Sequence, residues 1–362
     1  MRMSTDSQGF SAVAMAAMVI VVFLVVGAGY FFIVVQKPGA TENQPSGSPS
    51  DNQPPAENQE NAGSDFTPAI GAAAGQPGSY GPWNLRLRVA TSPDGTNWTR
   101  TGTTITDQGD VPCLIVADGK LWLFYVIWQD ADNTAVLRNT TVAACSSDLV
   151  NWTFKRLNFS GDFPSGYTNN PVDPTVVAID GGYRMYFTLG PLNPSSEKPH
   201  TFSATSTDLI NWTFEGERYE VSGEDVLDPN LLWVGDHYEF FAGGSPGGNH
   251  HASSTDGLTF TSLGSFSPQA SGYIVVMSNG MKVENTYKYY GFVNAPAGSD
   301  GVDIRSFSYS SGAGTWTLDN GAGLTVDAAS GEESMFVKDP AISVHPTGES
   351  SGYVMVYVTV IP

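Results

Sequence analysis

The chain has few basic residues: 16 lysines and arginines stand against 36 aspartates and glutamates, giving a formal net charge of -20. Nucleic-acid-binding surfaces need concentrated Lys and Arg, so this balance argues against nucleic acid as a partner. There are only two cysteines, Cys113 and Cys145, and no Cys/His cluster with zinc spacing. The two cysteines fall on non-neighbouring strands of one predicted sheet, so we expect no disulfide between them.

What the sequence does contain is a ten-residue pattern that occurs five times after residue 82. Its aromatic anchors are Trp98, Trp152, Trp212, Phe260 and Trp316. The anchors recur every roughly 50 residues, a period typical of the blades of a β-propeller. The Ser-x-Asp portion is expected to cap its own turn and the aromatic side chain to pack between blades, so we assign the repeat a structural role.

The order of strands at the two ends predicts how the ring closes. Taking strands A to D from the axis to the rim, the domain opens with a C–D pair (Leu85–Ala90 and 98–102) that no A–B pair precedes. It ends with an A–B pair, starting at Lys338, that no C–D pair follows. Joining the two halves in one sheet leaves no free edge strand. The predicted fold is therefore an all-β, five-bladed propeller with one composite blade.

We predict three parts along the chain: an N-terminal transmembrane anchor (1–36), a disordered linker rich in Pro, Gly, Ser and Asn (37–82), and the propeller (83–362). The segment 11–35 carries no charge and is long enough to span a bilayer as a helix. An uncleaved anchor and a removed signal peptide both remain open. The distribution of charge around this segment places the propeller outside the cytoplasm, held by a single membrane pass.

Candidate chemistry lies at the starts of the inner strands. Asp110, Asp173 and Asp228 each stand ten residues before the following aromatic-rich strand, so we expect them to occupy the same place in three consecutive blades and to converge at the axis. Asp339 takes that place in the composite blade, whereas the same count gives Met277 in blade four. Crowded carboxyl groups suit glycosyl transfer, because one can activate water, one can hold a proton for the leaving oxygen and a third can tune both.

These strands resemble the five-bladed glycosidase superfamily of arabinanases, xylosidases, arabinofuranosidases and invertases, with motifs such as DPTVVAIDGGYRMYF from Asp173. The resemblance implies that Asp110 is the base or nucleophile, Asp173 the residue that modulates pKa, and Asp228 the general acid. It implies hydrolysis or phosphorolysis of a glycosidic bond in an oligo- or polysaccharide. Two departures stand out: Asp110 precedes Val-Pro, and Asp228 stands where the superfamily has Glu. Glu224 could supply the acid from a nearby loop.

Other residues are candidates for substrate or metal binding. Trp128 could form a platform for a sugar ring or pack against the neighbouring blade, and we expect His250, Glu224 and Asp339 to bind substrate. His200 and His250 lie near the starts of C strands, and the resemblance implies that a histidine near the axis can help to hold a metal, often calcium. The sequence itself requires no cofactor, and a structural calcium at the axis is one option.

Enzymatic activity is left open by the sequence. The missing Glu and the vacant position in blade four favour an alternative, a catalytically inactive propeller that binds glycan or protein at the cell surface. In that case the shared aspartates would cap turns or bind a central ion. A sialidase-like enzyme would need an arginine cluster for the substrate carboxylate, whereas the eight arginines after residue 82 are scattered.

Overall fold

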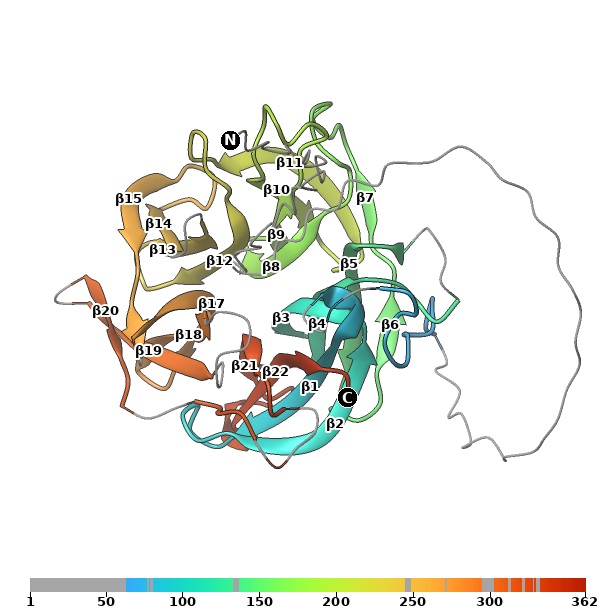
Figure 1. The fold of residues 1–362 in the computed structure, drawn as a ribbon. Coiled ribbons are helices and arrows are strands. Elements are labelled where there is room, and N and C mark those ends of the chain that lie inside the picture. The colour runs from blue at the N-terminus through green and yellow to red at the C-terminus, as the bar shows by residue number, and fades with distance from the viewer. Residues whose placement is uncertain are drawn as a thin grey trace, which may run out of the picture.

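The computed structural model describes residues 63–76, 78, 81–132, 137–244, 249–270, 272–294, 303–311, 314–320, 323–327, 329 and 333–362. Five sheets stand around a central axis, each as one blade of a propeller (Figure 1), and their strand pairs are antiparallel except at the rim of blade two, where β7 pairs parallel with β11. The inner strands β3, β8, β12, β17 and β21 contact one another in this order, and β21 contacts β3 again. The predicted all-β, five-bladed fold is therefore confirmed.

The blades follow the chain in order. Blade one contains β3 (Gly109–Ala117), β4 (Lys120–Ile127), β5 (Thr140–Ser146) and β6 (Thr153–Lys155). Blade two contains β8 (Val172–Ile179), β9 (Gly182–Leu189), β10 (His200–Ser206), β11 (Asn211–Tyr219) and, at its rim, β7 (Asn158–Ser160). Blade three contains β12 (Leu227–Trp233), β13 (Tyr238–Gly243), β14 (Asn249–Ser254) and β15 (Thr261–Phe266). Blade four contains β16 (Gln269–Ala270), β17 (Tyr273–Val283), β18 (Thr286–Asn294), β19 (Ile304–Ser310) and β20 (Thr315–Leu318).

The fifth blade is composite and closes the ring. It is ordered β21 (Lys338–Val344), β22 (Tyr353–Val360), β1 (Leu85–Ser92) and β2 (Thr99–Asp107) from the axis outward. β1 and β22 pair antiparallel along their whole length, from Leu85 opposite Val360 to Ser92 opposite Tyr353. The predicted closure is confirmed, and the two ends of the domain share one sheet (Figure 1).

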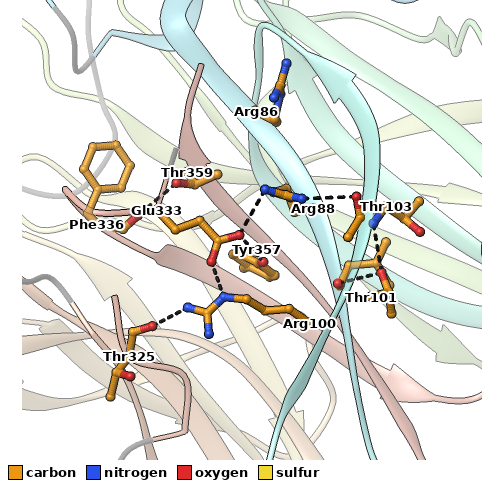
Figure 2. A network of polar contacts seen from close by, with 12 residues as sticks. Arg86, Arg88, Arg100, Thr101, Thr103, Thr325, Glu333, Phe336, Tyr357 and Thr359 are labelled. Atoms are coloured by element: carbon orange, nitrogen blue, oxygen red, sulfur yellow. Dashed lines mark hydrogen bonds and ion pairs between the residues drawn. The ribbon is translucent and has the colours of Figure 1, made fainter. Parts of the chain in front are cut away.

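A buried network of charges also holds the composite blade together. Glu333, only 1% exposed, accepts a hydrogen bond from Tyr357 Oη at 2.7 Å and pairs with Arg88 at 3.3 Å. Arg100 donates from its Nε to the other oxygen of the same carboxylate and from its guanidinium to Thr325 O (Figure 2). Two arginines from the N-terminal strands thus bind one carboxylate from the C-terminal part. We call Arg88, Arg100, Glu333 and Tyr357 the closure network.

The Ser-x-Asp turns have the predicted capping role. In the third copy, Asp208 Oδ1 accepts hydrogen bonds from the backbone N–H groups of Ile210 and Asn211 at 2.9 and 2.7 Å, and Ser206 Oγ accepts from Leu209 N at 2.9 Å. The same bonds occur at Asp94, Asp148 and Asp256. These bonds lower the pKa of Asp94, Asp148 and Asp256, and lower that of Asp208 to about 2 against the opposing effect of its burial.

The aromatic anchors pack between blades, as predicted. Trp212 of blade two meets Phe124 of blade one edge-on with ring centroids 6.0 Å apart, and Trp98 of the composite blade meets Tyr290 of blade four at 6.1 Å. Apolar clusters fill the spaces between neighbouring sheets. Both cysteines are free and buried, and Cys113 Sγ accepts a hydrogen bond from Val176 N of the next blade at 3.2 Å.

Residues 63–76 pack against the propeller, which differs from the flexible linker predicted for 37–82. Phe66 is 7% exposed, with its ring centroid 5.7 Å from that of Phe154, and Asp65 N donates to Phe154 O at 2.8 Å. Asp107 accepts a hydrogen bond from Gly71 N at 2.6 Å. Composition favoured disorder, but a single buried aromatic side chain and a few backbone bonds are enough to dock this segment.

The predicted anchor, 1–36, and the linker up to residue 62 lie outside the described residues. Within the described ranges the helical segments are two 3-10 turns, η1 (Pro82–Asn84) and η3 (Glu349–Ser351). None of the helices in this part of the chain has the length and apolar character needed to cross a bilayer.

Candidate functional site at the propeller axis

A β-bulge near the start of each inner strand directs the aspartates toward the axis. Asp173, Asp228 and Asp339 adopt left-handed backbone angles, with φ of 55°, 51° and 45°, and each precedes a proline. Aspartate adopts the left-handed backbone region more readily than most residues. The proline that follows has no N–H to donate, so the hydrogen-bond ladder of the strand is interrupted at the bulge. The bulges lie between residues 172 and 175, 227 and 230, and 338 and 341. All three side chains line the axial cavity.

Blade one is offset from this pattern by one residue. Its left-handed residue before proline is Val111, with φ of 46°. Asp110 lies opposite Val126 in the ladder, just as Lys338 lies opposite Val358 in the composite blade. Asp110 therefore corresponds to Lys338, and the prediction that it shares the place of Asp173 and Asp228 is wrong.

The reason for the offset lies in the hairpin that follows the inner strand. The ten-residue count assumed that the second strand begins at Lys120 in blade one and at Tyr183 in blade two. β4 does begin at Lys120, but β9 begins one residue earlier than expected, at Gly182. Ten residues after Asp110 the chain reaches the first residue of β4, whereas ten residues after Asp173 it reaches the second residue of β9.

The side chain of Asp110 nevertheless reaches the axial group. Lys338 Nζ donates hydrogen bonds to Asp110 Oδ1 at 2.9 Å and to Asp339 Oδ2 at 2.5 Å. Side chains of adjacent blades thereby meet through one ammonium group. The side-chain exposures are 15% for Lys338, 7% for Asp110 and 8% for Asp339. Burial opposes the charge of Lys338, but the two carboxylates raise the pKa of its ammonium above the usual value.

The pKa values of Asp173, Asp228 and Asp339 are all raised. Burial raises the pKa of Asp173 to about 7, and the negative charge of Asp110 acts in the same direction. Burial, followed by the charges of Asp173 and Asp339, raises the pKa of Asp228 well above its usual range. Burial also raises the pKa of Asp339 to about 7, although the Lys338 ammonium opposes the shift. This cluster can therefore hold protons near neutral pH, as a general acid must.

Asp228 has one oxygen available for further bonding. Its Oδ1 is buried and has no hydrogen-bond partner in the described part of the chain, although the side chain interacts with Asp173. Gly243 lies beside the other oxygen, where a Cβ atom at residue 243 would be 3.6 Å from Asp228 Oδ2. A buried oxygen without a partner is costly to the fold, so Asp228 is the axial carboxyl group that most needs an external partner.

The axial cavity is narrow at the carboxyl groups and wide beyond them. The described residues leave about 10 Å³ between Asp173, Asp228, Asp339 and the blade-four residues Met277 and Ser278, roughly the space of one water. Blade four contributes no carboxylate to this lining, as predicted.

Toward the other ends of the inner strands the channel opens into a funnel of about 860 Å³. Its lining includes the aliphatic side chains of Ile115, Val177 and Met281 and the indole of Trp233. Trp233 is 41% exposed and packs edge-on against Tyr238 at 4.9 Å. The lining also includes charged side chains, among them Asp180, Arg184 and Asp256, so the funnel combines apolar and charged walls with one accessible indole.

A calcium ion at the axis does not fit the residues found there. Carboxylate oxygens are suitable calcium ligands, but the Lys338 ammonium already contacts two of the four carboxyl groups and would repel a divalent cation. Among the described residues, no axial group of three carboxylates brings its oxygen atoms within 4.8 Å of one another. The group that meets this criterion is His200, Glu217 and Glu220 in blade two, where His200 Nδ1 is also hydrogen bonded to Tyr167 Oη at 3.0 Å.

The structure does not bring Trp128 to the axial cluster. Its indole is 8% exposed and packs edge-on against Trp83 with ring centroids 5.3 Å apart, while the Arg138 guanidinium lies 5.8 Å from the ring centre. This burial favours the packing role over the sugar platform.

His250 and Glu224 lie next to each other beside blade three. His250 Nε2 is hydrogen bonded to Asp225 O at 2.9 Å and lies 3.9 Å from Glu224 Oε2, whose side chain is 48% exposed. Gly244, the residue after the glycine beside Asp228, leaves room for the imidazole, because a Cβ there would lie 2.5 Å from His250 Nε2. His250 and Asp228 therefore lie beside two consecutive glycines, Gly244 and Gly243.

The sequence interpretation missed Lys338, the cation of the site. The signal was present: Lys338 immediately precedes the Asp339-Pro340 step, just as Val172 and Leu227 precede theirs. The equivalent position is apolar in blades two and three, and it is charged in blade one, at Asp110, and in the composite blade, at Lys338.

No protein-family model and no curated protein matches this chain. Among solved structures, it is similar to a thermostable family-43 glycoside hydrolase, with 13% identity, a TM-score of 0.53, and coverage of 69% of this chain and 88% of the other. An exo-1,5-alpha-L-arabinanase from a bovine ruminal metagenomic library has 12% identity, a TM-score of 0.49 and coverage of 69% and 92%. An N-acetylgalactosamine deacetylase from F. plautii, in complex with blood group B trisaccharide, has 12% identity, a TM-score of 0.48 and coverage of 76% and 95%. At these identities the likeness shows the fold, and the resemblance to the five-bladed glycosidase propellers is confirmed at that level.

Proposed function

We propose that this protein is a glycoside hydrolase that cleaves a glycosidic bond of an oligo- or polysaccharide with its axial carboxyl groups. The observation that carries the proposal is the pair Asp173 and Asp228. The two buried carboxyl groups interact, both have a raised pKa, and one oxygen of Asp228 lacks a partner. The glycosidase propeller fold is consistent with this reading but does not by itself supply a function.

In the proposed reaction, Asp228 gives its proton to the glycosidic oxygen as the bond from that oxygen to the anomeric carbon breaks. Asp110 takes a proton from the water whose oxygen bonds to the same carbon, so atoms and charges balance. Asp173 keeps Asp228 protonated through its negative charge when it ionises. Glu224, in the loop before β12, and His250, near the start of β14, would contact the sugar. Asp339 would hold Lys338 in place. A shorter Asp arm at the acid position requires the sugar to approach the axis closely.

The test is a screen of the full chain against aryl glycosides and polysaccharides, with Asp110→Asn as the comparison. We expect release of sugar by the wild type and a loss of roughly 100-fold or more in the variant, as for removal of a general base. Sugar release that Asp110→Asn leaves unchanged would remove Asp110 from the reaction.

The second candidate is a catalytically inactive propeller that binds glycan or protein. It is favoured by the narrow axial cavity and by the wide funnel on the other side, with the accessible indole of Trp233. Saturable glycan binding without turnover, unaffected by Asp110→Asn and weakened by Trp233→Ala, would support this candidate over hydrolysis.

We also propose that the propeller lies outside the cytoplasm and is tethered by the uncharged segment 11–35, which is long enough to span a bilayer as one helix. Residues 37–62, which are rich in Pro, Gly, Ser and Asn, would then form the linker between this segment and the propeller. The test is cell fractionation combined with protease added to intact cells. Membrane association with a protease-accessible propeller is expected, and recovery in the cytosolic fraction would contradict the proposal.

A further inference from the structure

The axial cluster contains its own cation. Among the described residues, four carboxyl groups and one ammonium meet at the axis: Asp110, Asp173, Asp228, Asp339 and Lys338. Lys338 occupies the same ladder position in the composite blade that Asp110 occupies in blade one. Their side chains extend toward each other from the inner strands of adjacent blades, β21 and β3. The Lys338 position is thus built into the repeat geometry of the propeller.

A group of buried carboxylates must be neutralised in some way, because each negative charge raises the cost of ionising the next. Protons, a metal ion or an internal cation can do this. At Asp173 and Asp228, burial favours the protonated form, and the negative charge of a neighbouring carboxylate, Asp110 beside Asp173 and Asp173 beside Asp228, acts in the same direction. At Asp110 and Asp339, the ammonium donates to both groups, at 2.9 and 2.5 Å. Burial raises the pKa of Asp339 as well, but there the ammonium opposes the shift, so the internal cation acts on the Asp110–Asp339 half of the cluster.

The position of the ammonium also competes with a metal. A divalent cation bound to Asp110 and Asp339 would have to lie where Lys338 Nζ now lies. The two cations would repel each other strongly in a site where all the side chains are at most 15% exposed. This agrees with the absence of a three-carboxylate ligand set among the described axial residues.

We propose that Lys338 stands in for a divalent cation at the propeller axis, so that the carboxyl groups are held together without metal, and that removing its charge turns Asp110 and Asp339 into a calcium-binding pair. The inference concerns the architecture of the site and does not depend on the glycosidase reaction. It makes Lys338 a positioning residue, which acts on the axial carboxyl groups and not directly on a substrate.

The experiment measures the thermal unfolding midpoint of the full chain with CaCl2 and with EDTA, for the wild type and for Lys338→Met, which has a similar length and no charge. We expect the wild type to be unaffected by either reagent. We expect Lys338→Met to be less stable without metal and to gain roughly 5 °C when calcium exceeds its dissociation constant about 100-fold. Lys338→Arg retains the charge and should stay insensitive to calcium.

Two results would overturn the proposal: calcium raising the midpoint of the wild type in a way that Asp339→Asn abolishes, or calcium failing to raise the midpoint of a folded Lys338→Met. If Lys338→Met does not fold, the double variant Lys338→Met/Asp339→Asn provides the second test, because it removes one charge of each sign. Folding of the double variant is expected, and its failure to fold would show that Lys338 does not act through charge balance.

Discussion

Two buried clusters of charge in this propeller have opposite balances. In the closure network, two arginines surround the single carboxylate of Glu333, and both of its oxygens are bonded (Figure 2). At the axis, four carboxyl groups share one lysine, and one oxygen of Asp228 has no partner among the described residues. A saturated cluster can only stabilise, whereas an unsaturated one has bonding capacity left for a substrate. The difference is consistent with a stabilising role for the first cluster and with the chemistry that we propose for the second.

The largest effect is expected from Asp228→Asn, which removes the proposed proton donor but preserves shape. We expect kcat/KM on a cleaved glycan to fall by roughly 100- to 10,000-fold, the usual contribution of a general acid. The unfolding midpoint should stay equal or rise, because one member of a crowded acidic group becomes neutral. Activity that survives the substitution would return the acid role to Glu224.

Glu333→Gln tests the closure network, the other of the two charged clusters. The change removes the carboxylate charge that neutralises Arg88 and Arg100, whose side chains are 16% and 30% exposed, and breaking such a partly buried ion pair costs roughly 1–3 kcal/mol. Chemical denaturation should therefore show a large loss of unfolding free energy. Turnover per folded molecule, measured well below the midpoint, should change little. A stable but inactive variant would show that the closure network contributes to the reaction.

The pH dependence of stability should differ in sign between the axis and the rim. The pKa of Asp173 is raised from 3.8 to about 7, so the stability from its protonation is complete below 3.8 and is lost as the pH rises through about 7. The pKa of Asp208 is lowered to about 2, so its contribution is present above 3.8 and is lost as the pH falls toward 2.

Thermal midpoints across this pH range check both signs. Asp173→Asn should flatten the decline on the neutral side, and Asp208→Asn should flatten the acid side while leaving turnover unchanged. If both variants keep the wild-type pH profile, neither aspartate titrates as described.

The smallest effect is expected from Tyr186→Phe. Tyr186 Oη donates to Gly257 O across blades two and three at 2.6 Å, and loss of one such bond costs about 1 kcal/mol. Tyr290→Phe is the matched variant, because Tyr290 Oη donates to Gly95 O between blade four and the composite blade at 2.6 Å. Urea unfolding should give similar losses for both, and a loss several-fold larger in one would show that its blade interface carries additional strain.

The sequence was sufficient for the blades because their signals are local and periodic. The repeats, the Asp-Pro steps at Asp173, Asp228 and Asp339, and the incomplete blades at the ends can all be read without knowing any long-range contact. The error at Asp110 arose from matching Lys120 of blade one with Tyr183 of blade two, whereas the structure matches Lys120 with Gly182. The Val-Pro step after Asp110, in place of an Asp-Pro step, was the residue pattern that marks the offset.

The contacts that sequence reasoning missed join distant parts of the chain. Arg100 and Glu333 are 233 residues apart, and Lys338 and Asp110 are 228 apart, so no spacing rule connects them. The role of Trp128 stayed open because one of the residues that cover it, Trp83, lies before β1 and far from the β4–β5 loop that holds Trp128 and Arg138. Burial of a loop side chain depends on such partners and cannot be obtained from local pattern.

The buried axial carboxyl groups, unlike the aspartates of the Ser-x-Asp turns, are expected to retain a proton near neutral pH. The most direct test is NMR titration of the full chain with ¹³C-labelled aspartate carboxyl groups, using Asp228→Asn to assign the axial signal. We predict one signal, missing in the variant, that titrates well above the range of the rim aspartates. Titration of every aspartate below about pH 4, the ordinary range of the side chain, would contradict the account.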